Sequence, residues 1–145
     1  TMTELNNRFC LIYTGQRRLA RNLLREVITK YICNDPVSVD AHYSIQRLAV
    51  LMRFELEKGN VDGFAKLLNE HWLLSQKIDK GCTNTCIDQI FLSIEDLIAG
   101  KMICGAGGGG FLQVVLKKGV SKDTLQARLR EVFKDSGDVW DCKFE

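Results

Sequence analysis

The sequence predicts a single α+β domain in which short strands flank a long helical region. Three observations carry this prediction. Short apolar runs, alternating or β-branched, lie near both ends of the chain and on either side of a glycine-rich segment at residues 105–110. Between these runs, apolar residues recur at the spacing of amphipathic helices. Capping residues and glycines divide the helical part into separate segments.

The first elements follow from periodicity at the start of the chain. Residues 8–13 form an apolar run that ends at Thr14 and Gly15, a turn signal, and we expect a buried strand there. A helix is expected to follow, with an inward stripe of Leu19, Leu23, Leu24, Val27, Ile28 and Tyr31. Arginines 17, 18, 21 and 25 form a basic stretch, which is typical of a solvated helix face.

Three more helices are predicted, each bounded by a capping residue and a glycine. The starts are marked by Asp35 with Pro36, by Asn60, and by Thr83 or Asn84. The ends are expected at Gly59, Gly81 and Gly100. The residues expected to face inward are Tyr43, Ile45, Leu48, Ala49, Met52 and Leu56, then Phe64, Leu67, Leu68, Trp72 and Ile78, then Ile87, Ile90, Phe91, Ile94 and Leu97.

The last third of the chain returns to strands. Residues 101–104 and 111–116 are expected as strands on either side of the glycines. Ser121 caps a fifth predicted helix, with Leu125, Leu129, Val132 and Phe133 inward, and residues 139–144 form a final strand in which Trp140 is a core residue. Merging the four helices into one crossover yields the split β-α-β-β-α-β order of ferredoxin-like domains, with an inserted helical subdomain. We expect one domain over residues 1–145.

Composition restricts the class of protein. The 145 residues are 46% hydrophobic and 26% charged, an ordinary soluble composition, and the net charge of +2 favours neither nucleic acid nor membrane as a partner. The polar start does not resemble a signal peptide, so a cytoplasmic protein is expected. The six cysteines suggest reduced core thiols. No metal site is expected, because Cys82 and Cys86 lack a second ligand pair.

The glycine loop is the strongest functional signal, and it consists of Gly105, Ala106, Gly107, Gly108, Gly109 and Gly110. It satisfies G-x-G-x-x-G, but a strand is expected after it instead of the helix that a dinucleotide site needs. So many glycines are costly to order, which favours a loop whose backbone approaches a ligand and whose amides point at anionic oxygens. The alternative is a flexible hairpin tip.

The segment from Met102 to Phe111 resembles the third conserved motif of the GHMP kinases. Residues 83–88 are similar to the segment before that family's last long helix, and residues 13–20 resemble its fucokinase and heptose-phosphate kinase branch. From Phe9 to Phe144 the chain is most similar to the C-terminal end of bacterial bifunctional fucokinase/L-fucose-1-phosphate guanylyltransferases. The family often has a lysine three residues before the loop. Met102 stands there and Lys101 one residue earlier, so no role is carried over to the lysine.

The resemblance implies a domain of an ATP-dependent sugar kinase that phosphorylates the anomeric hydroxyl of L-fucose. In that family the N-terminal domain holds the ATP loop, the catalytic base and most magnesium ligands, none of which has a counterpart in this sequence. We therefore expect no catalytic residue in this chain and no activity from the chain alone. ATP and Mg²⁺ would be used by the full-length enzyme and not bound tightly here. The expected partners are the N-terminal kinase domain and a small sugar.

Four further residues are candidates for substrate binding. Arg17 and Arg18 could reach a sugar or a phosphate from the strand-to-helix corner, Asn84 could be a ligand or a helix cap, and Asp88 could orient a hydroxyl or favour a helix N-terminus. Two alternatives to a fucokinase domain remain open. One is a heptose-phosphate or other GHMP sugar kinase domain, and the other is a non-catalytic ferredoxin-like binding module.

Overall fold

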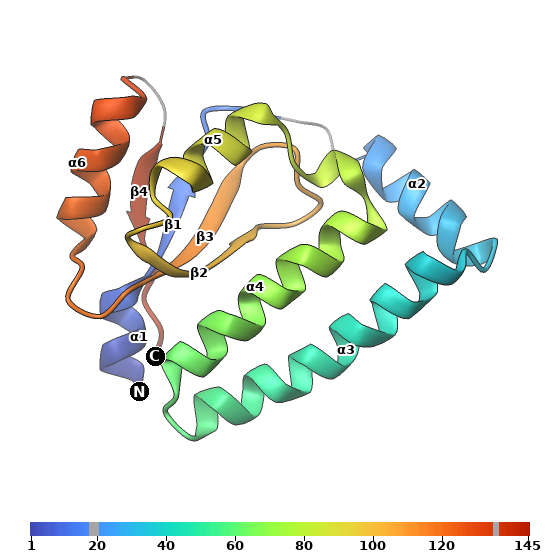
Figure 1. Ribbon diagram of the computed structural model, residues 1–145, viewed down its shortest axis with the longest axis horizontal. Helices are drawn as coiled ribbons and strands as arrows, with labels where there is room; N and C mark the ends of the chain where they lie inside the picture. The colour runs from blue at the N-terminus through green and yellow to red at the C-terminus, as the bar shows by residue number, and fades with distance from the viewer. Residues whose placement is uncertain (18–20, 135–136) are drawn as a thin grey trace.

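A computed structural model describes residues 1–17, 21–134 and 137–145 (Figure 1). Within these residues, one antiparallel sheet is built from β1 (Phe9–Tyr13), β2 (Ile98–Ile103), β3 (Phe111–Leu116) and β4 (Asp138–Asp141). Their order in the sheet is β2-β3-β1-β4. The two outer strands are joined to the centre by helical crossovers, so the predicted ferredoxin-like α+β fold is confirmed.

One face of the sheet is covered by α5 (Thr85–Ser93) and α6 (Lys122–Val132). These helices contribute buried Ile87, Ile90, Phe91, Leu125 and Leu129, all predicted to face inward. They pack on the alternate strand residues Cys10, Ile12, Ile103, Leu112, Val114 and Leu116. This is the main core of the domain, and the period-two burial of the strands follows from it.

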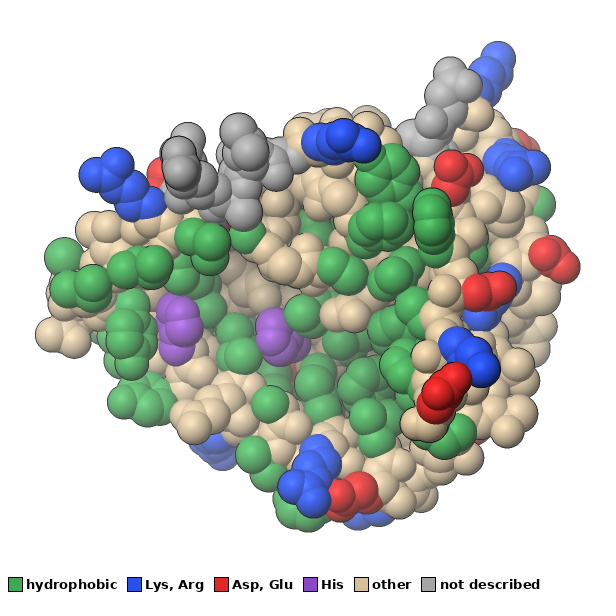
Figure 2. Space-filling view, turned by 180° about the vertical axis from the view of Figure 1, so that it is seen from behind, with side chains coloured by type: hydrophobic (Ala, Val, Ile, Leu, Met, Phe, Trp, Pro, Cys, Tyr) green, Lys and Arg blue, Asp and Glu red, His purple; other side chains and the backbone are tan. Residues whose placement is uncertain are grey.

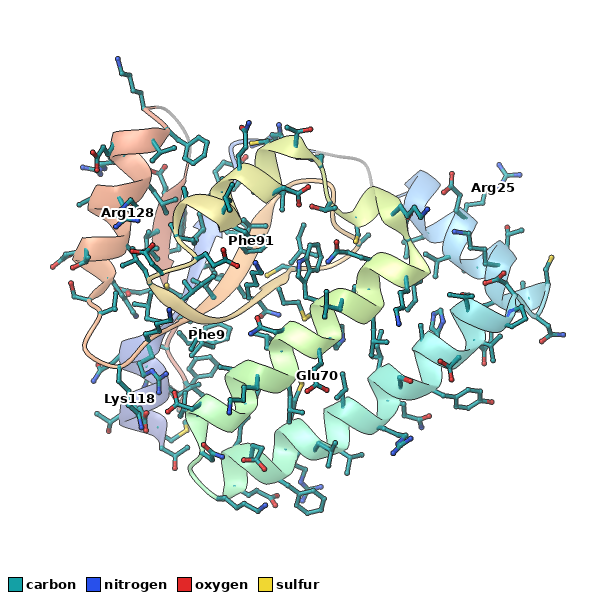
Figure 3. All side chains as sticks on the ribbon, in the orientation of Figure 1. Phe9, Arg25, Glu70, Phe91, Lys118 and Arg128 are labelled. Carbon is teal, nitrogen blue, oxygen red and sulfur yellow. The ribbon has the colours of Figure 1, made fainter. Side chains whose placement is uncertain are left out.

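The opposite face is covered only in part, by α1 (Met2–Arg8) and α4 (Val61–Ile78). A smaller core joins Leu5, Phe9, Val61, Ala65, Leu68 and Val115. Phe9 and Phe91 belong to these two separate clusters (Figure 3). Helix α1 was not predicted, because residues 1–7 are polar and lack an apolar stripe. The expected strand therefore begins at Phe9, and Arg8 is the last residue of α1.

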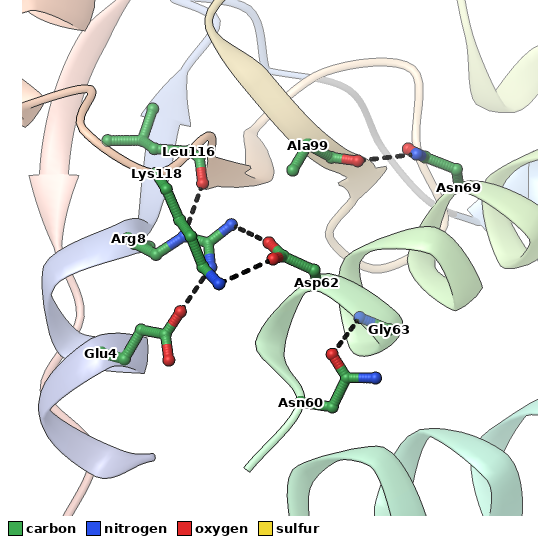
Figure 4. Close-up of polar contacts among 9 residues, drawn as sticks. All are labelled: Glu4, Arg8, Asn60, Asp62, Gly63, Asn69, Ala99, Leu116 and Lys118. Atoms are coloured by element: carbon green, nitrogen blue, oxygen red, sulfur yellow. Dashed lines mark hydrogen bonds and ion pairs between the residues drawn. The ribbon is translucent and has the colours of Figure 1, made fainter.

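Tertiary contacts of Arg8 hold α1 in place (Figure 4). Its side chain is 6% exposed, donates to the carbonyl of Leu116 at 2.8 Å, and forms ion pairs with Glu4 and Asp62. Lys118 also reaches Asp62, at 3.1 Å. Because a buried guanidinium needs such partners, this network ties α1 to β3 and to the start of α4.

The helical subdomain consists of α2 (Arg21–Ile32), α3 (Pro36–Glu57) and α4. The predicted caps are present: Asp35 accepts from the Ser38 amide at 2.8 Å and Asn60 from the Gly63 amide at 3.0 Å. Helix α3 lies against α4 and away from the sheet (Figure 1). The inward stripes were predicted only in part there: Leu48 is buried as expected, whereas Leu24, Ile28, Tyr31, Tyr43 and Ala49 are exposed. Leu19 lies outside the described residues, and for Leu23 only the backbone is described.

Two predicted helix ends were also wrong. Helix α4 ends at Ile78 and is followed by a short 3-10 helix, η1 (Lys80–Cys82), that contains Gly81. Gly100 lies within β2, where a Cβ would stand 2.6 Å from the carbonyl oxygen of Ala65. Glycine is needed there because the backbone of α4 packs directly against the strand. The Asn69 side chain of α4 donates to the carbonyl of Ala99 and accepts from the amide of Lys101, along the outer edge of β2. At the end of α6, Val132 is half-exposed, contrary to the prediction.

Candidate functional site at the glycine loop

The glycine loop joins β2 to β3 and is held by neighbouring segments through backbone hydrogen bonds. The amide of Gly108 donates to the carbonyl of Cys82 at 2.7 Å, and the amide of Gly110 donates to that of Gln16 at 2.8 Å. The carbonyl of Gly110 accepts from both the amide and the hydroxyl of the buried Thr14, at 2.9 and 3.0 Å. The loop is therefore anchored on both sides and is not a free hairpin tip.

Steric limits explain why two of these positions are glycine. Gly107 has φ +88°, and a Cβ there would lie 2.4 Å from the carbonyl oxygen of Cys82. Gly109 has φ +159°, and its Cβ would lie 3.0 Å from the carbonyl oxygen of Gln16. The loop backbone thus packs directly on the backbones of η1 and of the turn after β1, so that a side chain at Gly107 does not fit and one at Gly109 would crowd Gln16.

Asn84 connects these segments with its side chain. Its Oδ1 accepts from the amide of Ile87 at 3.0 Å and caps α5, as predicted. Its Nδ2 donates to the carbonyl of Gly108 at 3.1 Å and to Oε1 of Gln16 at 3.2 Å. Both ends of the amide therefore have partners within the chain.

Not every loop amide is free for a ligand, because those of Gly108 and Gly110 bond internally. The amides of Gly105, Ala106, Gly107 and Gly109 have no partner among the described residues. Amides of this kind could face an anionic oxygen.

A cavity of about 800 Å³ opens beside the loop. Ala106, Gly107, Gly109 and Gly110 form one side of it, and Gln16 and Arg17 contribute from the turn after β1. Both are exposed, so their polar groups can reach a ligand in the cavity. A ligand in this cavity could therefore come close to the backbone of the glycine loop and also meet the cationic side chain of Arg17.

The remaining wall of the cavity is aromatic and was not predicted. Tyr13, Phe111 and Trp140 line it. Their rings lie 5.1 Å apart for Tyr13 and Phe111, and 5.7 Å apart for Phe111 and Trp140. Trp140 is 55% exposed, so its assignment to the core was wrong. The sequence did contain a signal: Tyr13 ends one strand and Phe111 begins the strand after the loop.

The face of the sheet that contains these rings is broadly apolar. Figure 2 shows hydrophobic side chains gathered across the middle of this side of the molecule, with histidines among them. Beyond the aromatic wall, Met52, Phe64, Met102 and Phe144 line a further hollow between α3, α4 and the sheet. Neighbouring apolar side chains on one face of a molecule are common where another domain or ligand makes contact.

The other predicted site residues lie elsewhere. Arg18 is outside the described residues. Asp88 is exposed in the first turn of α5, where it accepts from the hydroxyl of Thr83 at 2.5 Å, and it does not line the cavity. Gly105 borders a neighbouring hollow together with Ala106. Arg25 lies on the exposed side of α2, as expected for a solvated helix face (Figure 3).

The shifted lysine before the loop lies on the wrong face for the cavity. Lys101 pairs in register with Val114, which faces α5, and its ammonium lies 5.3 Å from the ring centroid of Phe91. Met102 pairs with Gln113 and lies on the apolar face instead. The one-residue shift therefore separates Lys101 from the site.

The cysteines are only partly core residues. All six are free; Cys10 and Cys82 are buried, whereas Cys33 is exposed. Among the residues that the structure describes, no three His, Cys, Asp or Glu side chains are grouped so that they could hold a metal ion. Within the same residues, no helix is long and apolar enough to cross a membrane.

Comparison with known proteins gives relatives by sequence. No protein-family model matches the chain. It is 32% identical over 130 residues to the bifunctional fucokinase/GDP-fucose pyrophosphorylase of Arabidopsis thaliana. The matched residues make up 90% of this chain and 12% of that relative. It is 27% identical over 117 residues to the L-fucokinase/L-fucose-1-P guanylyltransferase of Bacteroides fragilis, again 12% of the relative. The chain thus corresponds to a small part of much longer proteins.

Solved structures share the fold. The L. major mevalonate kinase in complex with R-mevalonate matches 93% of this chain and 41% of its own, with a TM-score of 0.78 at 18% identity. The Lactococcus lactis galactokinase complexed with galactose matches 96% of this chain and 45% of its own, with a TM-score of 0.65 at 14% identity. At these identities the likeness concerns the fold alone.

Proposed function

We propose that this chain, a GHMP kinase C-terminal domain close to those of the fucokinases, forms one wall of the active-site cleft of an ATP-dependent sugar kinase. The reaction would transfer the γ-phosphoryl group of ATP to the anomeric hydroxyl of L-fucose. The observation that carries the proposal is the cavity between the glycine loop, Arg17 and the aromatic wall. The fucokinase relatives supply the substrate class.

The role of the domain in this proposal is to position groups. Phosphoryl transfer depends mainly on alignment and on neutralising charge on the phosphate oxygens. The unpartnered amides of Ala106, Gly107 and Gly109 and the Arg17 guanidinium belong to residues that line the cavity, and groups of this kind suit an anionic ligand. The described residues that line the cavity do not fit Mg²⁺, because none of them has a carboxylate to offer the ion. Magnesium ligands and the base would therefore come from another domain.

That other domain is the N-terminal kinase domain of the same polypeptide. The chain covers 12% of each relative, which supports its being one domain of a larger protein. The apolar face beside the cavity supports docking on a neighbouring domain, since its side chains are otherwise left in water (Figure 2).

A second candidate is a kinase for a phosphorylated sugar, such as a heptose phosphate. The observation that favours it is the exposed Arg17 at the cavity, since a guanidinium binds phosphate oxygens in a bidentate manner. Arg17→Lys would then raise KM for the phosphorylated sugar strongly and change KM for L-fucose little.

The test is an ATP-dependent phosphorylation assay with L-fucose and with a heptose phosphate. It compares this chain alone with a polypeptide that joins it to its N-terminal kinase domain. We expect fucose 1-phosphate from the joined polypeptide and none from the chain alone. Activity of the chain alone, or activity of the joined polypeptide with the heptose phosphate only, would overturn the proposal.

A further inference from the structure

We infer that Tyr13, Phe111 and Trp140 form an aromatic shelf that contacts the C6 methyl group of a 6-deoxy sugar. The shelf thereby selects such a sugar over its 6-hydroxy counterpart. This inference rests on the proposed function, because the cavity must first hold the sugar. It adds the residues that set specificity and the substituent that they recognise.

Sheet register brings the three rings to one place. Phe111 on β3 pairs with Tyr13 on β1, and Trp140 on β4 pairs with Leu11 on β1. Since Leu11 and Tyr13 are two residues apart, all these side chains lie on the face that α5 and α6 do not cover. The rings therefore continue across three adjacent strands beside the glycine loop.

The shelf has the geometry of a preformed surface. Phe111 meets Trp140 edge to face, with an interplanar angle of 87°, and meets Tyr13 at 44°. Edge-to-face contact is a preferred arrangement of aromatic rings, so it stabilises these ring orientations without a ligand. Trp140 nevertheless leaves 55% of its surface in water, so a ligand that covers the indole gains apolar burial.

The other walls determine which ligand fits. Gln16 and Arg17 bring polar side chains to the cavity, and three loop residues whose amides have no partner among the described residues, Ala106, Gly107 and Gly109, line it as well. The occupant therefore needs hydroxyl or anionic oxygens on one side and an apolar group on the other. L-fucose has both: its ring hydroxyls are polar and its C6 is a methyl group. In L-galactose a hydroxymethyl group replaces that methyl group and would meet the rings.

The expected selectivity is limited by the chemistry. A hydrophobic wall rejects an analogue that merely adds a hydroxyl by about 100-fold at most. A shelf that is open on one side should discriminate less, by about 10-fold in kcat/KM. Truncating Trp140 should remove most of this preference, and Phe at the same position should keep much of it.

The experiment measures kcat/KM for L-fucose and for L-galactose in the joined kinase, in the wild type and in Trp140→Ala, Trp140→Phe and Leu92→Ala variants. Leu92 is a matched control, because it is 71% exposed on α5, on the other face of the sheet. We expect most of the preference for fucose, about tenfold in the wild type, to be lost in W140A, much of it to persist in W140F and all of it to remain in L92A. Melting temperatures of the chain confirm that the variants fold.

The outcomes separate the two proposals. If the wild-type joined kinase phosphorylates neither sugar, the proposed function fails, and the shelf assignment fails with it. If it phosphorylates L-fucose but W140A keeps the wild-type ratio, only the shelf assignment is overturned. A loss of activity in W140A that is equal for both sugars would also overturn it, and would place Trp140 in a contact between domains. A KM change for ATP alone would place the nucleotide base on the shelf.

Discussion

The side-chain amide of Asn84 donates a hydrogen bond to the carbonyl of Gly108 at 3.1 Å, across 24 residues of sequence. The same side chain caps α5 through the amide of Ile87. One residue therefore fixes the start of a core helix and the middle of the glycine loop. These two tasks can be separated, because capping needs an acceptor and the loop contact needs a donor.

Asn84→Asp should keep the cap and lose the loop contact. An aspartate accepts from the Ile87 amide, but its carboxylate would face two acceptors, the carbonyl of Gly108 and Oε1 of Gln16. Asn84→Ala loses both interactions, and the cap alone is worth about 1 kcal/mol. We expect amide hydrogen exchange at Gly108 and Gly110 to accelerate in both variants, with the larger loss of unfolding free energy in N84A. Unchanged exchange in N84D would contradict the role assigned to the side-chain amide.

Gly107→Ala should destabilise the domain far more than Gly105→Ala. Both residues have positive φ, +88° and +70°, so each alanine incurs about 1 to 2 kcal/mol of backbone strain. Only at Gly107 does the new Cβ meet backbone, at 2.4 Å from the carbonyl oxygen of Cys82, whereas nothing lies within 4 Å at Gly105. Urea unfolding of the chain should therefore show a loss above about 3 kcal/mol for G107A. Equal losses in the two variants would mean that the loop does not pack on η1.

Asp62→Asn should lower stability at neutral pH but not in acid. Hydrogen bonds from Arg8 and Lys118 hold the pKa of Asp62 below its ordinary value. Its contribution is therefore complete above the unfolded pKa of about 3.9 and disappears as the pH falls through the lower folded pKa. Because the Asp62 side chain is 45% exposed, solvent screening limits the loss at pH 7 to about 1 kcal/mol. The measurement is the unfolding free energy of D62N and wild type between pH 7 and pH 2.5.

A matched control for D62N is Glu57→Gln, which breaks the fully surface pair with Arg53. Its effect should be smaller, because both partners lie largely in water. The account of Arg8 would be wrong if D62N and E57Q had equal effects at pH 7.

Thiol reactivity should follow burial. Burial raises the pKa of Cys10 to about 12 and that of Cys82 to about 11, so neither forms appreciable thiolate at pH 8. Cys33 is exposed and should react first with a thiol reagent in the folded chain. All six should titrate after denaturation without reductant. Fast labelling of Cys10 in the native chain, or fewer than six thiols in the denatured chain, would contradict the structure.

Local signals in the sequence determined much of the fold. Helix caps act within one helical turn. The structure shows that each predicted cap side chain accepts a hydrogen bond from a backbone amide, at Asp35, Asn60, Asn84 and Ser121. The stripes that pack on the sheet, such as Ile87 with Phe91 and Leu125 with Leu129, were identified because one face of each helix meets a continuous apolar layer. The glycine loop was identified as a candidate site for a reason that is also local, the backbone freedom of glycine.

Only the tertiary structure decided what lies against these local features. Helix α1 depends on the contacts of Arg8 with Leu116 and Asp62, which lie 108 and 54 residues away. Residues of the predicted α2 stripe such as Leu24 and Ile28 are exposed. Apolar periodicity shows that a helix has an apolar face, but it does not show whether a partner covers that face. Trp140 became a cavity residue through the pairing of β4 with β1, which sets the sheet face on which the indole lies and leaves that end uncovered. The sequence of a strand shows which residues alternate between its two faces. Its pairing register and the helices that cover each face depend on distant segments of the chain, so they are decided only when the chain folds.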